Sequence, residues 1–359
     1  MKRNEFLDFA KGILIILVPV GHALQYAVYQ NQDFFSDPFF KAIYMFHMPL
    51  FMGIAGFLSH AGMEKNPPGK FMRARAQTYL VPILAWAVLY QVILFICLGG
   101  HGWSAFPKAF VREFLSGLWF LWALVGCLAM TAAARAFGRY FWAVYALMFC
   151  GILFLPDTGI LYLFKYMVPY FQAGYLLAAL GGFTMKGTRA FGLFAVAGGL
   201  TAGCYLLWND NTYIYTSKMA LVRGNYGNIG LRYLSGFAAS VLALFIIRYL
   251  YLKTPESVNR FVRALGRDSI YIYILQYHLF VVLALLATRY FPPFGGSLSG
   301  VAFACLAGLL IASGCWLAGK MLAGNEWLAA VLFGKIKKPG QPPQPAVLAV
   351  APHGDAEGV

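Results

Sequence analysis

The chain has 359 residues, of which 60% are hydrophobic and 11% are charged, and its formal net charge is +15. Soluble domains carry about 25% charged residues, so this composition excludes an ordinary soluble protein and predicts an integral membrane protein. The basic residues lie mostly in short stretches between apolar runs, where they set membrane orientation or meet anionic lipids and substrates, so we expect no nucleic-acid partner.

Apolar runs of about 20 residues predict an all-α fold, a polytopic membrane helix bundle with about ten transmembrane helices. The expected spans are 7–28, 43–61, 78–98, 116–134, 140–156, 163–183, 191–208, 230–251, 269–288 and 299–322. More Lys and Arg residues lie on the N-terminal side of this arrangement than on the other, which predicts that both termini are cytoplasmic. We expect residues 1–335 to form a single membrane domain and the Pro-rich segment 336–359 to be a disordered cytoplasmic tail.

The first span carries polar residues on one face. Lys11, Ile15, Val18 and His22 follow each other at helical steps of four, three and four, and Asp8 extends the same face by one turn. His22 lies roughly 16 Å from Lys11 along the helix axis. A charged residue near the bilayer centre costs about 2.5–3.5 kcal/mol, so such residues usually face a protein interior or a watery cavity. A functional site and a polar packing network are both compatible with this face.

The chemistry that these residues favour is proton transfer, because histidine is the side chain best suited to move a proton near neutral pH. The sequence has no HExxH motif, no phosphate-binding loop and no companion serine motif. The six cysteines fall in apolar segments without metal-type spacing, so no metal site is expected. His22 is therefore interpreted as a general base, with Asp8 as a candidate partner of Lys11.

The second span begins with "YMFHMPLFMGIAGFL", in which His47 is a packing residue or a site residue. Gly53 and Gly56 in the same stretch permit a close approach of another helix. The loop that follows holds a basic cluster just before the third span, and this cluster either anchors the chain at the membrane surface or binds an anion such as phosphate. Its members are Lys70, Arg73 and Arg75.

Three later segments carry weaker candidates for substrate-binding residues, namely Trp119, Tyr273, Gln276 and Arg232. "SGLWFLWALVG" places Trp119 near a membrane interface, where an aromatic belt is the simpler explanation. "GRDSIYIYILQYHLF" places Tyr273 and Gln276 on one face of the ninth span, as a polar lining or as core hydrogen-bonding groups. Arg232, at the start of the eighth span, is a candidate contact for the acceptor substrate.

Taken in order, these segments resemble the membrane-bound acyltransferase-3 family, the O-acetyltransferases that modify bacterial surface polysaccharides and related glycans. The carrying stretches are "FLDFAKGILIILVPVGH", "FHMPLFMGIAGFL", "RARAQTYLVP", "LWFLWAL" and "LGRDSIYIYILQ". The resemblance implies transfer of an acyl group, by default acetyl, from acyl-CoA to a hydroxyl group of a carbohydrate or glycolipid. It also implies a multi-pass protein of the bacterial inner membrane.

The resemblance also implies roles for individual residues. The family's basic residue, ten intervening residues and a histidine match Lys11 and His22, which makes His22 the expected catalytic residue, and the second-span histidine matches His47. The arginine pair near the CoA end maps onto Arg73 and Arg75. The spacing departs from the family here, because the two arginines are separated by one residue where two are common. His22 acts as a general base or takes the acyl group itself, and sequence does not separate these routes.

Two rival functions remain open at this stage. A transporter or flippase for a glycolipid or small anion would use Lys11 and His22 as a proton relay. A membrane sensor without enzymatic activity would use His22 as a pH switch. Transporters are often built from inverted repeats, and the sequence shows none that is convincing.

Overall fold

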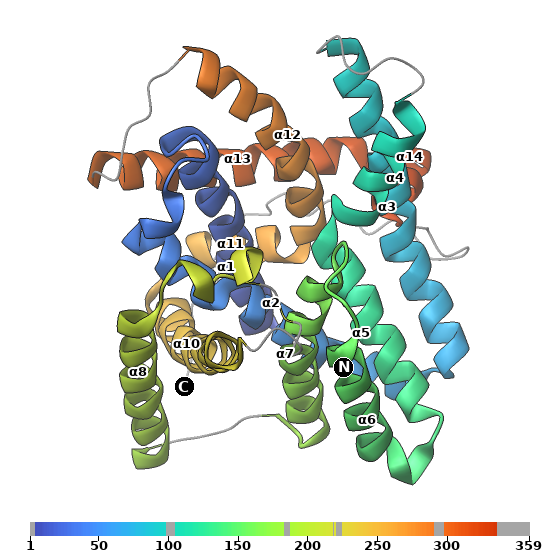
Figure 1. Cartoon of the computed structure of the whole chain (residues 1–359), viewed down its shortest axis with the longest axis vertical. Coiled ribbons are helices and arrows are strands. Elements are labelled where there is room, and N and C mark those ends of the chain that lie inside the picture. The colour runs from blue at the N-terminus through green and yellow to red at the C-terminus, as the bar shows by residue number, and fades with distance from the viewer. Residues whose placement is uncertain are drawn as a thin grey trace, which may run out of the picture.

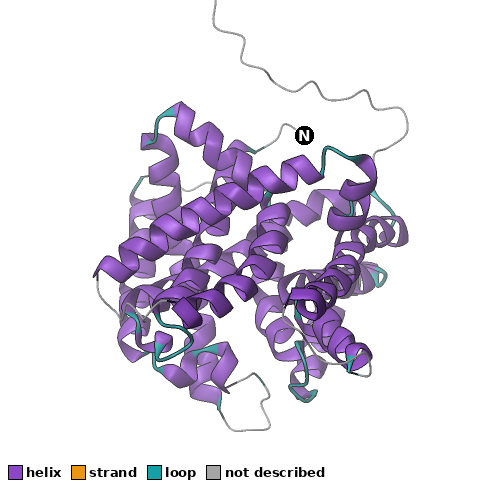
Figure 2. Ribbon diagram, turned by 90° about the horizontal axis from the view of Figure 1, so that it is seen from above, coloured by secondary structure: helices purple, strands orange, loops and turns teal. Residues whose placement is uncertain are grey.

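A computed structural model describes residues 4–97, 105–182, 187–217, 219, 225–290 and 298–335. Within these residues the regular structure is helical throughout, without a strand (Figure 2). The helices cross each other at varied inclinations around a central group that contains α1 (Figure 1). The predicted all-α bundle is confirmed, while the predicted tail 336–359 lies outside the described residues.

The α-helices follow one another with short connections. They are α1 (Glu5–Ala23), α2 (Pro38–Lys65), α3 (Pro68–Cys97), α4 (Phe106–Ser116), α5 (Trp119–Arg135), α6 (Phe141–Phe154), α7 (Leu161–Ala179), α8 (Thr188–Leu207), α9 (Ile214–Ser217), α10 (Tyr226–Lys253), α11 (Glu256–Arg267), α12 (Ser269–Tyr290), α13 (Leu298–Leu322) and α14 (Glu326–Phe333). A π-helical turn, η1 (Leu24–Val28), directly continues α1.

Each of the ten predicted spans falls on one of these helices, namely α1, α2, α3, α5, α6, α7, α8, α10, α12 and α13. Among the described residues, six helices are long and apolar enough to cross a membrane, or seven if α4 and α5, which are bent by 58° relative to each other, form one broken span. An integral membrane protein follows from these helices. The number of ten crossings and the orientation of the termini stay predictions.

α1 lies at the centre of the bundle and packs against α2, α10, α11, α12 and α13. Its contact with α11 is very close, because a Cβ atom on Gly12 would lie 2.1 Å from the Val262 carbonyl oxygen and one on Gly266 would lie 1.8 Å from the Asp8 carbonyl oxygen. Glycine at both positions lets the two backbones touch. α11 was not expected from the sequence, and it fixes the end of α1 that carries Lys11.

α2 and α7 form the second close helix pair. A Cβ atom on Gly56 would lie 2.0 Å from the carbonyl oxygen of Phe171, and one on Gly174 would lie 1.9 Å from the carbonyl oxygen of Gly53. The expectation that Gly53 and Gly56 permit a close helix approach is confirmed. This contact holds α2, and with it His47, at a fixed distance from α7.

The outer helices expose large apolar side chains. Leu147 on α6, Phe191 on α8 and Leu206 on α8 are 74%, 73% and 83% exposed. In an integral membrane protein, such surfaces face lipid hydrocarbon. The polar side chains that are candidates for chemistry must therefore be sought among the inner helices.

Candidate active site

The polar face of α1 begins with an ion pair near the start of the helix. Asn4 caps α1 by accepting a hydrogen bond from the Leu7 backbone N–H at 3.2 Å. Lys11 Nζ lies 3.0 Å from Asp8 Oδ1, one helical turn away, and both side chains are largely buried. The expected pairing of Asp8 with Lys11 is present, and it lowers the free-energy cost of placing each charge inside the bundle.

At the other end of this face, His22 is bonded to α12. Its Nδ1 lies 2.8 Å from Gln276 Oε1, and Gln276 Nε2 donates to the Tyr273 carbonyl oxygen at 3.2 Å. The rings of Tyr26 and Phe280 stand edge-on to the imidazole, with centroids 5.8 and 5.4 Å away. His22 is half-buried, whereas Gln276 is 1% exposed. The predicted site residues His22 and Gln276 are therefore in direct contact.

The chain is α-helical up to His22 and becomes π-helical shortly after this residue. α1 passes through Pro19 and continues to Ala23, and the turn from Leu24 to Val28 is then a π-helix. Its last bond joins the Tyr29 N–H to the Leu24 carbonyl at 2.9 Å. π-Helical turns are rare and frequently occur at functional sites.

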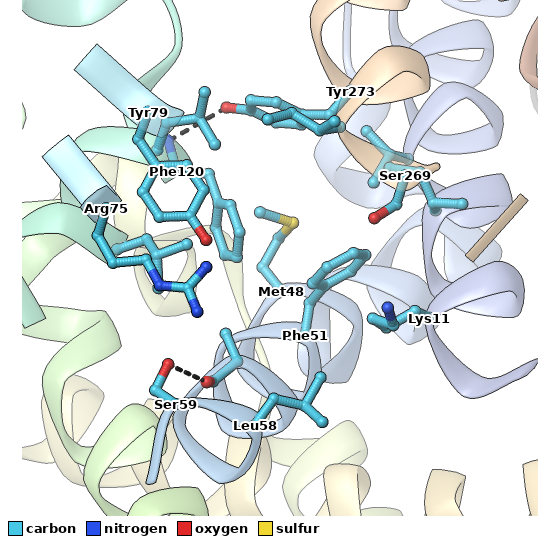
Figure 3. Close-up of a pocket in the computed structure, with 16 residues that line it drawn as sticks. Lys11, Met48, Phe51, Leu58, Ser59, Arg75, Tyr79, Phe120, Ser269 and Tyr273 are labelled. Atoms are coloured by element: carbon cyan, nitrogen blue, oxygen red, sulfur yellow. Dashed lines mark hydrogen bonds between the residues drawn. The ribbon is translucent and has the colours of Figure 1, made fainter. Parts of the chain in front are cut away.

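A cavity of about 240 Å³ adjoins the same face of α1. Lys11 and Arg75 lie on opposite walls of it, with Met48 and Phe51 between them and Tyr273 further along (Figure 3). The rest of the wall is mostly apolar and comes from α1, α2, α3, α5 and α12. The apolar lining residues include Ile15, Val18, Met48, Phe51, Phe120 and Leu124. The cavity thus combines two cationic walls with an apolar interior.

His47 lies on α2 at the level of His22. The cavity places Ile15 and Val18 of α1 among residues 48 to 59 of the antiparallel α2. The Tyr44 ring, whose centroid is 4.8 Å from that of His47, lies against Gly21, the residue before His22, because a Cβ atom on Gly21 would be 3.0 Å from this ring. His47 is 4% exposed, and its Nδ1 lies 2.8 Å from the Ile43 carbonyl oxygen, so its ring is held by its own helix.

Tyr273 connects α12 with the beginning of α5. Its hydroxyl accepts a hydrogen bond from the Phe120 backbone N–H at 3.1 Å, just after the 58° break between α4 and α5 (Figure 3). The first N–H groups of a helix lack partners within the helix, so this hydroxyl satisfies one of them. Trp119 is only half-buried and its ring stands edge-on to that of Phe120, but it is not part of the cavity wall.

Of the three residues in the basic cluster, only Arg75 lies in the cavity wall. Arg75 lines the cavity, and its guanidinium lies 5.1 Å from the centre of the Phe71 ring. Lys70 and Arg73 are exposed on the same helix and are not part of the cavity wall. Residues 73 and 75 point to different sides of α3 because they are two positions apart on a helix.

Arg232 lies away from the cavity and is bonded to backbone carbonyl groups. Its Nε donates to Thr212 at 2.6 Å, and Nη2 donates to Tyr213 at 3.2 Å and to Asn211 at 3.3 Å. Arg232 is 1% exposed. The side chain therefore organises the segment before α9, and the structure does not bring it to the other predicted site residues.

Among the polar cavity residues, Ser59 and Tyr79 are ones that the sequence patterns do not single out. Ser59 donates to the Ala55 carbonyl at 2.7 Å from the α2 wall, and Tyr79 lies one turn after Arg75 on the α3 wall. The four-residue spacing from Arg75 was the available signal for Tyr79. Within the described residues, no group of three or more His, Cys, Asp or Glu side chains could hold a metal ion.

The chain is similar to known proteins over most of its length. A family model described as "Acyltransferase domain" matches residues 4–320. The nodulation protein NolL of Sinorhizobium fredii is 32% identical over 286 residues, which is 76% of this chain and 77% of that protein. The NolL protein of Mesorhizobium japonicum is 31% identical over 301 residues, which is 79% of this chain and 78% of that protein. No solved structure matches the chain.

Proposed function

The chain belongs to the acyltransferase-3 family and is a membrane acyltransferase, and from this premise we propose that it moves an acetyl group from acetyl-CoA to a carbohydrate or glycolipid hydroxyl group. The proposal includes the bacterial inner membrane as the location and the cytoplasm as the source of the acyl donor. A transporter or flippase was the rival interpretation of the sequence, and membership in an acyltransferase family favours the enzyme.

The cationic and apolar walls of the cavity support an acyl-CoA donor. Acetyl-CoA has anionic phosphates at one end and a long, slender arm that ends in the thioester. Lys11 and Arg75 supply positive charge on the cavity walls, and arginine is well suited to phosphate. Lys70 and Arg73, exposed near the start of α3, meet the nucleotide outside the cavity. The arm then runs along the apolar walls toward Tyr273.

The observation that carries the proposal is the position of His22 on α1. Lys11, Ile15 and Val18 line the cavity, and His22 is the next residue on the same face. It is held there by Gln276, one turn beyond the cavity residue Tyr273 on α12. A thioester that passes Val18 and Tyr273 therefore meets an imidazole.

The transfer then proceeds with His22 as general base. The acceptor hydroxyl gives its proton to the imidazole, and its oxygen forms a bond to the thioester carbonyl carbon. The carbon–sulfur bond breaks, and the thiolate of CoA takes the proton from the imidazolium, so that the base is restored. The Tyr273 hydroxyl, which already accepts a bond from the Phe120 N–H, donates its own proton toward the carbonyl oxygen as negative charge develops there.

The acceptor approaches from the side of His22 that faces away from Lys11. Tyr26 follows His22 by one turn, and Tyr44 precedes His47 by one turn. The Tyr44 ring lies 6.4 Å from that of Tyr215, which is 39% exposed. Tyrosine presents an apolar ring and a hydroxyl group together, which suits the mixed surface of a sugar.

The test uses membranes that contain the wild type, His22→Ala or His278→Ala, at equal levels of folded protein. His278 is the matched control, because it is a buried histidine on α12 whose Nδ1 is bonded to the Ile274 carbonyl. With radiolabelled acetyl-CoA, we expect label in the glycan or glycolipid fraction for the wild type and His278→Ala, and none for His22→Ala. Full transfer by His22→Ala would refute the assigned base. If no folded protein transferred label while native glycan was present, the acetyl-CoA proposal would fail.

A further inference from the structure

We propose that Gln276 is a positioning residue for His22, which it holds in the tautomer that leaves Nε2 free to act as the base. This inference rests on the proposed function, because it concerns the residue assigned there as the base. It goes further by assigning a role in the reaction to Gln276, which the sequence predicts only as part of a polar lining or as a core hydrogen-bonding group.

The orientation of the Gln276 amide follows from its second hydrogen bond. Oxygen and nitrogen of a glutamine side chain are assigned from their hydrogen-bond partners. Gln276 Nε2 is 3.2 Å from the Tyr273 carbonyl oxygen, which accepts only. The amide nitrogen must therefore point to Tyr273, and the amide oxygen must point to His22.

The tautomer of His22 follows in turn. Gln276 Oε1 lies 2.8 Å from His22 Nδ1, and an amide oxygen accepts but does not donate. Nδ1 must therefore carry the proton, and in the neutral ring Nε2 keeps its lone pair. Within the described part of the chain, no hydrogen bond is made to Nε2. The nitrogen that the mechanism needs is thus unprotonated and available.

The surroundings favour an uncharged partner over a carboxylate. Gln276 is 1% exposed, and the Phe280 ring stands edge-on to the imidazole. A carboxylate at this position would place a charge where water does not reach it, which is unfavourable unless the imidazole is protonated. The titratable groups that face His22 are Tyr26 on its own segment and His47 on α2. Gln276 therefore orients the ring without drawing a proton onto it.

Two substitutions separate positioning from packing. Gln276→Leu keeps the size of the side chain but removes the acceptor, and Gln276→Glu keeps an acceptor oxygen for Nδ1–H and adds charge. If Gln276 only fills space, the leucine variant will be active and the glutamate variant will be impaired. If Gln276 positions His22, the order is reversed. Gln91 is the matched control, because it is a buried glutamine on α3 whose amide donates to the Ala109 carbonyl at 3.3 Å.

We expect Gln276→Leu to lower kcat for acetyl transfer by about 10- to 100-fold, with the KM for acetyl-CoA unchanged, because a wrong tautomer removes the base but not the donor site. Gln276→Glu should keep kcat within about tenfold of the wild type at its optimum. It should move the acid limb of the pH–rate profile to higher pH by about one unit, because a carboxylate stabilises the imidazolium. Gln91→Leu and Gln91→Glu should leave the acid limb in place.

The outcomes distinguish this inference from the proposed function. If His22→Ala is inactive but Gln276→Leu transfers acetyl as the wild type does, Gln276 is not a positioning residue. An unshifted acid limb in an active Gln276→Glu protein would also overturn the inference, even if Gln276→Leu did not fold. If His22→Ala is itself active, the assigned base is wrong, and the fault lies in the proposed function.

Discussion

The two ends of the bundle interior use the same kinds of side chain differently. In the cavity end, Lys11 and Arg75 stand on the walls of an open space. In the loop end, formed by residues 155–165, 209–217, 219 and 232, Arg232 and Lys165 are 1% and 0% exposed and bonded to protein oxygens. The difference teaches that a cation in a membrane span indicates a ligand site only when its charged group borders space that a ligand can enter.

Among the substitutions that test this comparison, His22→Gln should have the largest effect on activity. His22 is the next residue on the helix face beyond the cavity wall. The glutamine amide can still donate to Gln276 Oε1 but cannot take a proton from a hydroxyl group. We expect acetyl transfer to fall by about 10²- to 10⁴-fold, the usual contribution of a general base, with an unchanged Tm in detergent. Measured turnover within threefold of the wild type would contradict the role of His22. His278→Gln serves as the control.

Substitutions in the loop end should lower the free energy of unfolding, whereas substitutions in the cavity end should lower the activity. Asp157 Oδ1 lies 2.8 Å from Lys165 Nζ, and the two side chains are 1% and 0% exposed. Asp157→Asn leaves the Lys165 charge buried without its counter-charge, and we expect a loss of about 3–5 kcal/mol in the free energy of unfolding.

This loss would appear as a lower Tm and a lower yield of folded protein by size-exclusion chromatography. The surviving folded fraction should keep the KM for acetyl-CoA of the wild type. A stable Asp157→Asn protein with a raised KM would show that this ion pair lies in the substrate path. That result would contradict the distinction between the two ends.

Within the basic cluster, the comparison predicts that substitutions of the two neighbouring arginines change the KM for acetyl-CoA by different amounts. Arg75 borders the cavity and Arg73 is exposed. Arg75→Ala should raise the KM for acetyl-CoA by about tenfold, which corresponds to about 1.4 kcal/mol of lost binding. Arg73→Ala should change this KM by less than about threefold, since exposed ion pairs contribute little. Steady-state kinetics over a range of salt concentrations measures both, and equal effects would show that the cavity is not the phosphate end.

The long helices could be predicted because apolar runs of about 20 residues have few other stable structures. α11 and α14 could not be found by this criterion, since they are short and one of them is largely polar. The amphipathic pattern of α11, which buries Val262 and Gly266 against α1, was the signal present in the sequence.

The site was predictable where its residues share one helix. The spacing of Lys11 and His22 placed both on one face of α1, and both lie where that face predicts. The bond between His22 and Gln276 joins positions 254 residues apart, and a single sequence carries no signal for such a contact. Arg75 could not be preferred over Arg73, because the phase of α3 relative to its neighbours is set by packing. For the same reason, Arg232 could not be assigned to the loop end.

The π-helical turn from Leu24 to Val28 has a consequence for the tolerance of this chain to insertions and deletions. A π-helical turn is an α-helix with one residue inserted, so the side chains after it are rotated by about 100° relative to a continuous α-helix. Deleting one residue of this turn would leave His22 against Gln276 but would rotate the segment between this turn and α2. The Tyr29 hydroxyl, which donates to Asp37 Oδ2 at 2.7 Å, would then face another direction. The direction of the side chains up to His22 and the direction of those after the π-helical turn can thus be changed separately by deleting one residue.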